Sequence, residues 1–562
     1  MPFKSSQPNI DLPTNITNWT WLFNSPASPL QTIPPSQLAS YTNATTQERV
    51  SWSQVKTHAT HLSTALVRHH GLKKRDVVAL FSQNTIWYPV AMLAVNRVGG
   101  TISGASPAYN VEEMTYALKT ANAKYLFTIP GSMDVASAAA KNAGIPKERV
   151  FLLEGETEGF TTMKQLLELG KKEGDRGQVE EYKLKDGEKN KDLCGFLSFS
   201  SGTTGLPKAV MISHQNVIAQ CLQIQQITPN THRKVLAVLP SFHITGLVHA
   251  LHLPILLNAE VYMLSAFTMK SMLDTVVRYR IQELLLVPPI IIRLVRDPIV
   301  DEYDLSFVTR FSSGAAPLSE EIIHLLKKKF PNTGFKQGYG MTESCSCITA
   351  HPPEKYGYEH AHKVGSICAS TTIKIVDEDG KELEINQPGE LLAKGPQIVM
   401  GYLNNPKATK DTFDSDGYLH TGDQAMIDSE GMVTITDRIK EMIKVKGIGV
   451  APAELEDLLL GHKHVEDVAV LGIPDDYSGE KPKAYIVRKQ GAPGEKEVGE
   501  GLLKYVKEKK VRHKWVKEVE FIGEIPKSAS GKILRRLLRG KSRKGSEGVV
   551  VRDESVREKA KL

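Results

Sequence analysis

Cysteine is scarce in this sequence, with only five cysteines among 562 residues. A chain of this length with so few cysteines does not depend on a disulfide framework, which small secreted domains use in place of a large core. The one close pair, Cys345 and Cys347, has no second pair or histidines at zinc-site spacing. The sequence therefore predicts neither a disulfide-rich fold nor a zinc site.

Long apolar runs are also missing. No uninterrupted apolar stretch reaches the roughly 20 residues that a membrane-spanning helix needs. The first ten residues, MPFKSSQPNI, lack the apolar core of a secretory signal peptide. We therefore expect neither a transmembrane segment nor a signal peptide.

Little excess charge lies outside the C-terminal tail. The formal net charge is +7, and residues 535–562 contain ten Lys or Arg against four Asp or Glu. The tail thus holds +6 of the +7, which leaves +1 for the rest of the chain. We expect no nucleic-acid partner, because such a partner requires a basic surface on the body of the protein.

Short apolar runs rich in β-branched residues alternate with helix-like stretches over much of the chain. The runs include residues 77–81, 124–128 and 235–239, and the helix-like stretches include residues 87–98 and 319–330. This alternation predicts an α/β fold with substantially parallel sheet. Residues 171–191 are mostly Lys, Glu, Asp and Gly, and they predict a solvated loop.

The pattern becomes strand-rich from residue 373 onward. Turn signals occur at residues 377–380, 414–417 and 428–431. A smaller α+β unit then follows Arg438. We expect three parts: a large domain of residues 1–437, a small domain of residues 438–536, and a basic, flexible tail of residues 537–562.

Residues 200–208, SSGTTGLPK, combine features that suit a polyphosphate. Glycines let backbone N–H groups approach an anion, hydroxyls add donors, and the lysine adds charge. The spacing differs from both the Walker A loop and the Rossmann fingerprint. On chemistry alone the segment is either an anion-binding loop or a Gly/Ser/Thr surface loop, and it specifies no reaction.

Residues 197–210 closely resemble the signature loop of the adenylate-forming superfamily, which includes acyl-CoA synthetases, 4-coumarate–CoA ligases, luciferases and peptide-synthetase adenylation domains. Seven further blocks follow in the family's order: LPSFHITGL (239–247), SGAAPL (313–318), QGYGMTE (337–343), residues 389–403, YLHTGD (418–423), DRIKEMIKVKGIGVAPAELE (437–456) and IPKSASGKILRR (525–536). The resemblance spans roughly residues 50–536. It implies an α/β fold with mixed or parallel sheets and a small β-barrel-like subdomain in the N-terminal domain, plus a small, mobile α+β C-terminal domain.

The family reaction implied by this resemblance is that of an AMP-forming acyl-CoA synthetase, an acid–thiol ligase using ATP, Mg²⁺ and CoA. A carboxylate and ATP give acyl-AMP and pyrophosphate, and CoA then displaces AMP. Two rivals share the motifs: an adenylation enzyme that loads a separate carrier protein, and luciferase-like oxidation of the adenylate. A non-catalytic homologue is disfavoured because the motif residues, including Lys208, Glu343 and Lys532, are intact.

The resemblance assigns the nucleotide to residues spread over the blocks. Tyr339 would stack on adenine, Thr342 would donate to the α-phosphate, and Glu343 would hold Mg²⁺. Asp423 would accept the ribose hydroxyls, to which Arg438 would also donate. The loop residues would hold the β- and γ-phosphates. The full set of expected ATP or AMP ligands is Ser201, Gly202, Thr203, Thr204, Gly205, Lys208, Gly314, Ala315, Ala316, Gly338, Tyr339, Gly340, Thr342, Asp423, Arg438 and Lys532.

The catalytic candidates are Lys532, His243 and Thr342. Adenylation brings two negative charges together, so the site must supply cations and oriented donors. Lys532 would reach the developing charge, and His243 would orient the acid or gate CoA entry. Lys440 matches the family's hinge. The expected acid- and CoA-side residues are His243, Thr245, Lys444, Lys446 and Gly447.

Two departures from the 4-coumarate ligase pattern concern the acid. Ile244 and Thr245 replace a position that is often tyrosine, and residues 446–450 read KGIGV where KGFQV is common. Residues 287–296 form an aliphatic wall with Arg293 and Arg296 as possible polar handles. We expect a medium-chain fatty acid, an aryl-alkanoic acid or a specialised-metabolite acid.

The last three residues, Ala560, Lys561 and Leu562, differ from the peroxisomal address SKL only by one hydroxyl. They predict recognition by the peroxisomal import receptor and a location in the peroxisomal matrix. Without that recognition the chain would be cytoplasmic.

Overall fold

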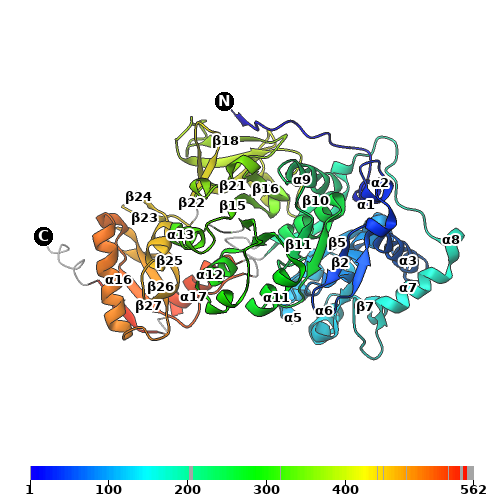
Figure 1. The fold of residues 1–562 in the computed structure, drawn as a ribbon, viewed down its shortest axis with the longest axis horizontal. Coiled ribbons are helices and arrows are strands. Elements are labelled where there is room, and N and C mark those ends of the chain that lie inside the picture. Colours follow the sequence, from blue (N-terminus) through cyan, green and yellow to red (C-terminus); the bar gives the residue numbers. More distant parts are fainter. Residues whose placement is uncertain are drawn as a thin grey trace.

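The computed structural model describes residues 2–200, 207–314, 316, 318–439, 441–446, 448–475, 478–528, 531–544 and 548–553. In these residues the chain builds three sheet layers and a half-barrel, followed by a separate small C-terminal domain (Figure 1). The α/β class is confirmed. None of the helices in the described part of the chain combines the length and apolar composition that a membrane span needs.

The first layer is an eight-stranded sheet whose central strands are parallel. Helices α3 (Trp52–His70), α4 (Trp87–Arg97) and α5 (Val111–Thr120) alternate with its strands. Helix α3 begins at a reciprocal Ser51–Gln54 capping box and ends at Gly71 in the left-handed region, as its sequence dictates. In order, the strands are β20 (Gly401–Tyr402), β10 (Lys208–Ser213), β9 (Cys194–Ser200), β5 (Thr101–Ala105), β4 (Val77–Phe81), β6 (Ala123–Thr128), β7 (Val150–Leu152) and β8 (Thr161–Thr162).

Further helices accompany this sheet and two others. Helices α6 (Met133–Asn142) and α7 (Met163–Lys172) pack against α5 and α3, and the remaining ones are α9 (His214–Gln226), α11 (Met269–Tyr279), α12 (Pro288–Arg296) and α13 (Glu320–Lys329). The four-stranded sheet is β11 (Lys234–Ala237), β12 (Glu260–Met263), β2 (Ser40–Asn43) and β3 (Arg49–Ser51). The five-stranded sheet is β13 (Glu283–Leu286), β14 (Arg310–Ser313), β15 (Gly334–Met341), β16 (Ser346–Ala350) and β17 (Ser366–Ile367), with the first three strands parallel.

The half-barrel is an antiparallel sheet. Its turn signals are confirmed, because Gly380, Gly417 and Gly431 each take positive φ and bond back three residues. The strands are β1 (Phe3–Lys4), β18 (Thr372–Val376), β19 (Gly389–Lys394), β21 (Leu419–Ile427) and β22 (Val433–Arg438).

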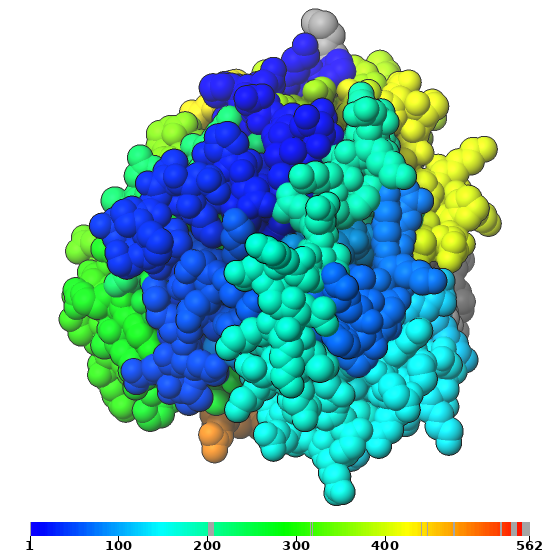
Figure 2. Space-filling model, turned by 90° about the vertical axis from the view of Figure 1, so that its right-hand side faces the viewer, coloured from blue at the N-terminus to red at the C-terminus, as the bar shows by residue number. Residues whose placement is uncertain are grey.

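The small C-terminal domain packs against α12 and α13, on the left of Figure 1. Its sheet runs β24 (Ile448–Val450), β23 (Ile443–Val445), β26 (Gly479–Arg488), β27 (Glu518–Phe521) and β28 (Val550–Arg552), and β25 (Val465–Asp475) also pairs with β26. Helices α15 (Pro452–Leu460) and α16 (Glu495–Lys509) accompany it. The opposite face of the molecule is covered by the blue-to-cyan N-terminal part of the chain (Figure 2).

Two expectations about loops are corrected. Residues 171–191 are helical at their start, in the end of α7 and a short helix, α8 (Gly174–Gly177), whereas residues 178–189 form the loop that was expected. The tail expected to be flexible from residue 537 instead continues α17 (Arg535–Lys544) and supplies β28, which pairs with β27. The paired Lys507 and Asp553, 2.7 Å apart, explain this order, because tertiary partners override a basic composition. Residues 554–562, with the terminal tripeptide, lie outside the described residues.

Candidate functional site

One cavity of about 860 Å³ lies where the parallel sheets, the half-barrel and the small domain meet. Most of the predicted site residues that the structure describes line it. They are Lys208, His243, Thr245, Gly314, Gly338, Gly340, Thr342, Glu343, Asp423, Arg438 and Lys532. Four sheets and a small-domain loop thus contribute to a single space.

The ends of β9 and β10 form one wall of the cavity. Ser200 and Lys208 are register partners on these antiparallel strands, and both line the cavity. The Lys208 ammonium lies 4.6 Å from the centre of the Tyr402 ring. The predicted phosphate ligands between these strands, Ser201, Gly202, Thr203, Thr204 and Gly205, lie outside the described residues, as does Ala315.

The QGYGMTE block forms the end of β15 and the turn after it. A Cβ at Gly340 would lie 1.5 Å from the Ser346 carbonyl oxygen, so only glycine fits where β15 approaches β16. The following turn brings Thr342 and Glu343 to the cavity. The Tyr402 hydroxyl donates to Glu343 Oε1 at 2.8 Å, which fixes the position of this carboxylate.

Asp423 and Arg438 are cross-strand partners on β21 and β22. The Arg438 Nε lies 3.4 Å from Asp423 Oδ1, and the Tyr339 hydroxyl donates to Asp423 Oδ2 at 2.7 Å. Burial raises the pKa of Asp423, although Arg438 opposes the rise. Tyr339 is directed at Asp423 and is absent from the cavity lining, and Ala316 does not line the cavity either.

Lys532 reaches the cavity from a tight turn of the small domain. The Ser528 N–H donates to the Lys532 carbonyl and the Gly531 N–H donates to the Ser528 carbonyl, both at 2.8 Å. Gly531 has a φ of +81°, and a Cβ there would lie 2.8 Å from Pro289 Cδ of α12. Glycine therefore permits both the turn and its close packing on the large domain.

Arg535 anchors this turn to the rest of the small domain. Its Nη2 donates to both carboxylate oxygens of Glu456, at 2.6 and 2.7 Å, and its Nη1 donates to Glu441 Oε2 at 2.7 Å. Its Nε donates to the Val470 carbonyl at 3.1 Å. This bidentate, buried arrangement holds the backbone that presents the neighbouring lysine.

Charged side chains of other motif residues surround Lys532 and shift its pKa. Burial, and then the positive charge of Arg438, lower the pKa of Lys532 to about 8. The carboxylates of Glu441, Asp423 and Glu343 oppose this shift. Burial and the Lys532 charge also lower the pKa of His243 to about 4, so this imidazole is neutral at neutral pH.

The CoA-side candidates lie elsewhere. Lys444 is on β23, with its Nζ 3.8 Å from Glu378 Oε1, and Lys446 has a positive φ of 52° just after that strand. Neither residue lines the cavity that Lys532 enters. Gly447 and the hinge candidate Lys440 lie outside the described residues.

The prediction that Arg293 and Arg296 of α12 are polar groups of the acid pocket is wrong. Arg293 donates to Asp297 on its own helix at 2.9 Å, and Arg296 lies 3.6 Å from Glu321 of α13 and donates to the Leu460 carbonyl. Neither arginine lines the cavity. Both occupy the face of α12 that meets exposed helix ends and the small domain.

Sequence reasoning missed a group of polar side chains in the same cavity: His232, His249, Glu283, Ser312, Lys336 and Ser346. The signal that could have found them is a charged residue within an apolar strand, at Glu283 in ELLL and at Lys336 just before QGYGMTE. Such residues are seldom buried without a reason.

Two family models match the chain. Residues 34–403 match the model described as AMP-binding enzyme, and residues 454–532 match the AMP-binding enzyme C-terminal domain. Together the two matches include most of the residues that line the cavity.

Several known proteins are similar along most of the chain. The 4-coumarate–CoA ligase-like 1 of Arabidopsis thaliana is 36% identical over 548 residues, covering 96% of each protein. The peroxisomal OPC-8:0-CoA ligase 1 of the same plant is 37% identical over 476 residues, covering 83% of this chain and 84% of that protein. Among solved structures, ATP-bound MatB from Rhodopseudomonas palustris superposes with a TM-score of 0.81 at 26% identity, covering 94% of this chain and 99% of that one.

Proposed function

Because the chain belongs to the AMP-binding enzyme family and is an AMP-forming acid–CoA ligase using ATP, Mg²⁺ and CoA, we propose that its large cavity activates the acid where Lys532 meets Arg438 and Asp423. The observation that carries this proposal is the convergence of a small-domain lysine on large-domain motif residues within one cavity. No single domain contains all of these groups.

In the first half-reaction a carboxylate oxygen attacks the α-phosphorus of ATP, and the bond from that phosphorus to the pyrophosphate oxygen breaks. Lys532 faces the developing negative charge as an ammonium, and Thr342 donates its hydroxyl to an α-phosphate oxygen. Lys208, with the loop of residues 201–205, holds the β- and γ-phosphates. Fixed cations and donors of this kind are worth most where water is excluded.

Glu343 suits a magnesium ion. Its carboxylate lines the cavity, and within the described residues only its Oε1 accepts a hydrogen bond. Mg²⁺ in phosphate-transfer sites takes one or two carboxylates together with substrate phosphates. When bound, the ion neutralises phosphate charge, and Glu343 would hold it there.

Asp423 and Arg438 bind the ribose, and Gly314, Gly338 and Gly340 allow the nucleotide to approach the backbone. Tyr339, whose hydroxyl donates to Asp423, shapes the same nucleoside site, and stacking on adenine stays a prediction. Ala315 and Ala316 complete the adenine wall in this proposal.

His243 and Thr245 orient the carboxylate of the acid, and Lys444 serves the acid-pocket side. Lys446 and Gly447 serve CoA after a rotation about Lys440. In the second half-reaction the CoA thiolate attacks the acyl carbonyl carbon, and AMP leaves. Lys444 and Lys446 lie outside the cavity while Lys532 is inside it, which supports the use of two domain arrangements.

We also propose that the enzyme works in the peroxisomal matrix, delivered by an import receptor that binds Ala560, Lys561 and Leu562. The tripeptide itself and the peroxisomal relative support this location.

Lys532→Ala is the test of the site. Pyrophosphate exchange with a panel of carboxylic acids should fall by at least about 100-fold, because one oriented cation at the developing charge is lost. Thioester formation from supplied acyl-AMP and CoA should change only a few-fold. Lys504→Ala, on the exposed face of α16, is the matched control. Equal loss of both half-reactions would contradict the role of Lys532, and no AMP formation by the wild type with any acid would contradict the function.

A further inference from the structure

The cavity has a second polar region on the strands β13, β14 and β15. These strands are parallel and in register, with Glu283 beside Arg310 and Ser312 beside Lys336. Successive side chains of a strand point to opposite faces. Most of the residues that these strands contribute to the cavity lining alternate accordingly, and Ser313 lines it as well; the alternating residues are Glu283, Leu285, Ser312, Gly314, Lys336, Gly338 and Gly340.

Lys336 lies far from the phosphate end of this face. It precedes Met341, the last residue of β15 before the turn with Thr342, by five residues, which corresponds to about 17 Å at about 3.3 Å per residue. The cavity lining also contains hydrocarbon side chains, and Leu285 follows Glu283 on the same face of β13; the others are Ile224, Val235, Leu236, Leu253 and Ala350. A substrate that extends from the reaction centre toward Lys336 therefore passes an apolar stretch.

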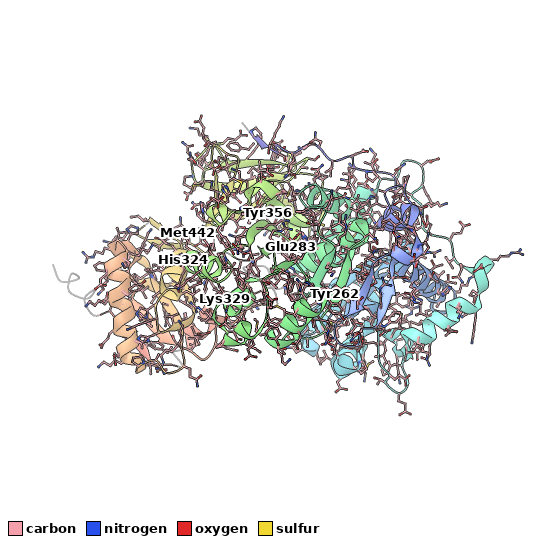
Figure 3. The ribbon with its side chains drawn as sticks, in the orientation of Figure 1. Tyr262, Glu283, His324, Lys329, Tyr356 and Met442 are labelled. Atoms are coloured by element: carbon pink, nitrogen blue, oxygen red, sulfur yellow. The ribbon has the colours of Figure 1, made fainter. Side chains whose placement is uncertain are left out.

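We define the distal polar cluster as His232, His249, Glu283, Arg310, Ser312, Lys336 and Ser346. Glu283 is its centre, and Figure 3 labels it in the middle of the molecule, close to Tyr356. His232 Nδ1 lies 3.1 Å from Glu283 Oε2, and the Ser312 hydroxyl donates to Glu283 Oε1 at 3.0 Å. Arg310 also pairs with Glu283 and lies 4.4 Å from the Tyr356 ring centre.

The carboxyl of Glu283 is ionised. Burial opposes its ionisation, but the hydrogen bond from His232 and the charges of His232, Lys336 and Arg310 hold its pKa well below the usual range. The Glu283 carboxylate is thus already paired with Arg310. The His249 imidazole, 3.1 Å from the Ser346 hydroxyl, adds no positive charge at neutral pH, because burial and then Lys336 lower its pKa to about 3.

Lys336 is therefore a cation in excess. Within the described residues its ammonium makes no ion pair or hydrogen bond, and its nearest ring contact is Tyr356, 5.9 Å from the ring centre. Without any contribution from the histidines, Arg310 and Lys336 against Glu283 leave a net charge of +1. An acid that fills the cavity would remove the half-buried Lys336 charge from water, which is costly unless an opposite charge accompanies it, so this end of the cavity favours an anion.

We propose that the acid activated by this enzyme carries a second carboxylate at the end remote from the reacting one, and that Lys336 binds it. This substrate class, a dicarboxylic acid with an apolar middle, rests on the proposed acid–CoA ligase function. A plain fatty acid would leave the ammonium facing hydrocarbon. A terminal hydroxyl would satisfy a hydrogen bond but would not neutralise the charge.

The test compares matched acids with the purified full-length enzyme. AMP release with CoA is measured for octanoate, 8-hydroxyoctanoate and octanedioate, and for diacids from hexanedioate to dodecanedioate. We expect kcat/KM for the favoured diacid to exceed that for the monoacid of equal length by at least about tenfold, as a charge-assisted hydrogen bond provides. Lys336→Met should remove this preference, and Lys336→Arg should retain part of it.

Lys329→Met is the matched control, because Lys329 ends α13, pairs with Asp301 at 2.8 Å and lies outside the cavity (Figure 3). It should keep the wild-type preference. A wild type that prefers the monoacid or the hydroxy acid at every length overturns the proposal without relying on any variant. A diacid preference that survives in a folded Lys336→Met enzyme, with an unchanged thermal midpoint, also overturns it. If no acid yields AMP, the ligase function itself fails.

Discussion

The charge state of Lys532 should set the alkaline limit of adenylation. Its pKa is lowered from 10.5 to about 8 by burial and by Arg438. The proposed mechanism uses the protonated ammonium, so activity should be full below this pKa and should be lost as pH rises through it. One pH unit above the pKa about 90% of the lysine is neutral, so kcat/KM should fall about tenfold per unit.

The pH profiles of kcat/KM and of kcat should report the pKa of Lys532 in the free enzyme and in the substrate complex, respectively. A profile of kcat/KM for pyrophosphate exchange reports the free enzyme, so its alkaline limb should lie near pH 8. Bound phosphates raise the pKa of a neighbouring lysine, so the same limb in kcat should move to higher pH. With supplied acyl-AMP the rate should instead rise over this range, because a larger fraction of the attacking CoA thiol is ionised as the pH rises.

The Lys532→Arg variant tests whether the alkaline limb comes from Lys532 or from another group, since a guanidinium stays charged throughout the accessible pH range. Even a slow Lys532→Arg enzyme should lose the alkaline limb. A wild-type kcat/KM that is flat to about pH 9.5, or the same limb in the arginine variant, would refute the reasoning.

Two further predictions concern the small domain and the tail. Arg535→Met leaves the buried Glu456 without its arginine partner, and should lower the free energy of unfolding measured in urea by about 3–5 kcal/mol. Adding Glu456→Gln should recover part of this loss. An unchanged unfolding curve would argue against the anchoring role of Arg535. A fluorescent protein fused ahead of the full chain should co-localise with a peroxisomal marker, whereas the fusion lacking Ala560, Lys561 and Leu562 should be diffuse; identical patterns would contradict the import signal.

Much of the nucleotide site could be predicted because its chemistry lies in contiguous motifs. SGK in residues 530–532 and TGD in residues 421–423 identify Lys532 and Asp423 without any knowledge of the fold. The structure adds that residues more than one hundred positions apart line one cavity. Motif order alone could not show this, because it depends on how the small domain docks.

The distal polar cluster could not be predicted, and the reason is the register of the sheet. Lys336 and Glu283 lie more than fifty positions apart in the sequence, and a one-residue shift of either strand would turn its side chain to the other face. Arg293 and Arg296 failed for a related reason. An amphipathic helix shows from its sequence which residues share a face, but not which neighbour that face meets.

The tail shows how composition can mislead. Residues 537–552 are basic and read as solvated, yet β28 pairs with β27 and buries Val551. Here the decisive contacts are long-range, and local propensity is only a weak prior against them.

The alternation along β15 has a consequence for how such enzymes diverge. Lys336 and Gly338 are neighbours on one face of one strand, yet the first belongs to the acid end of the cavity and the second to the nucleotide motif. A point mutation at residue 336 can therefore exchange one class of metabolite for another while the machinery that handles ATP is inherited intact. After gene duplication, a change of this single codon would be enough to give one copy a new substrate class.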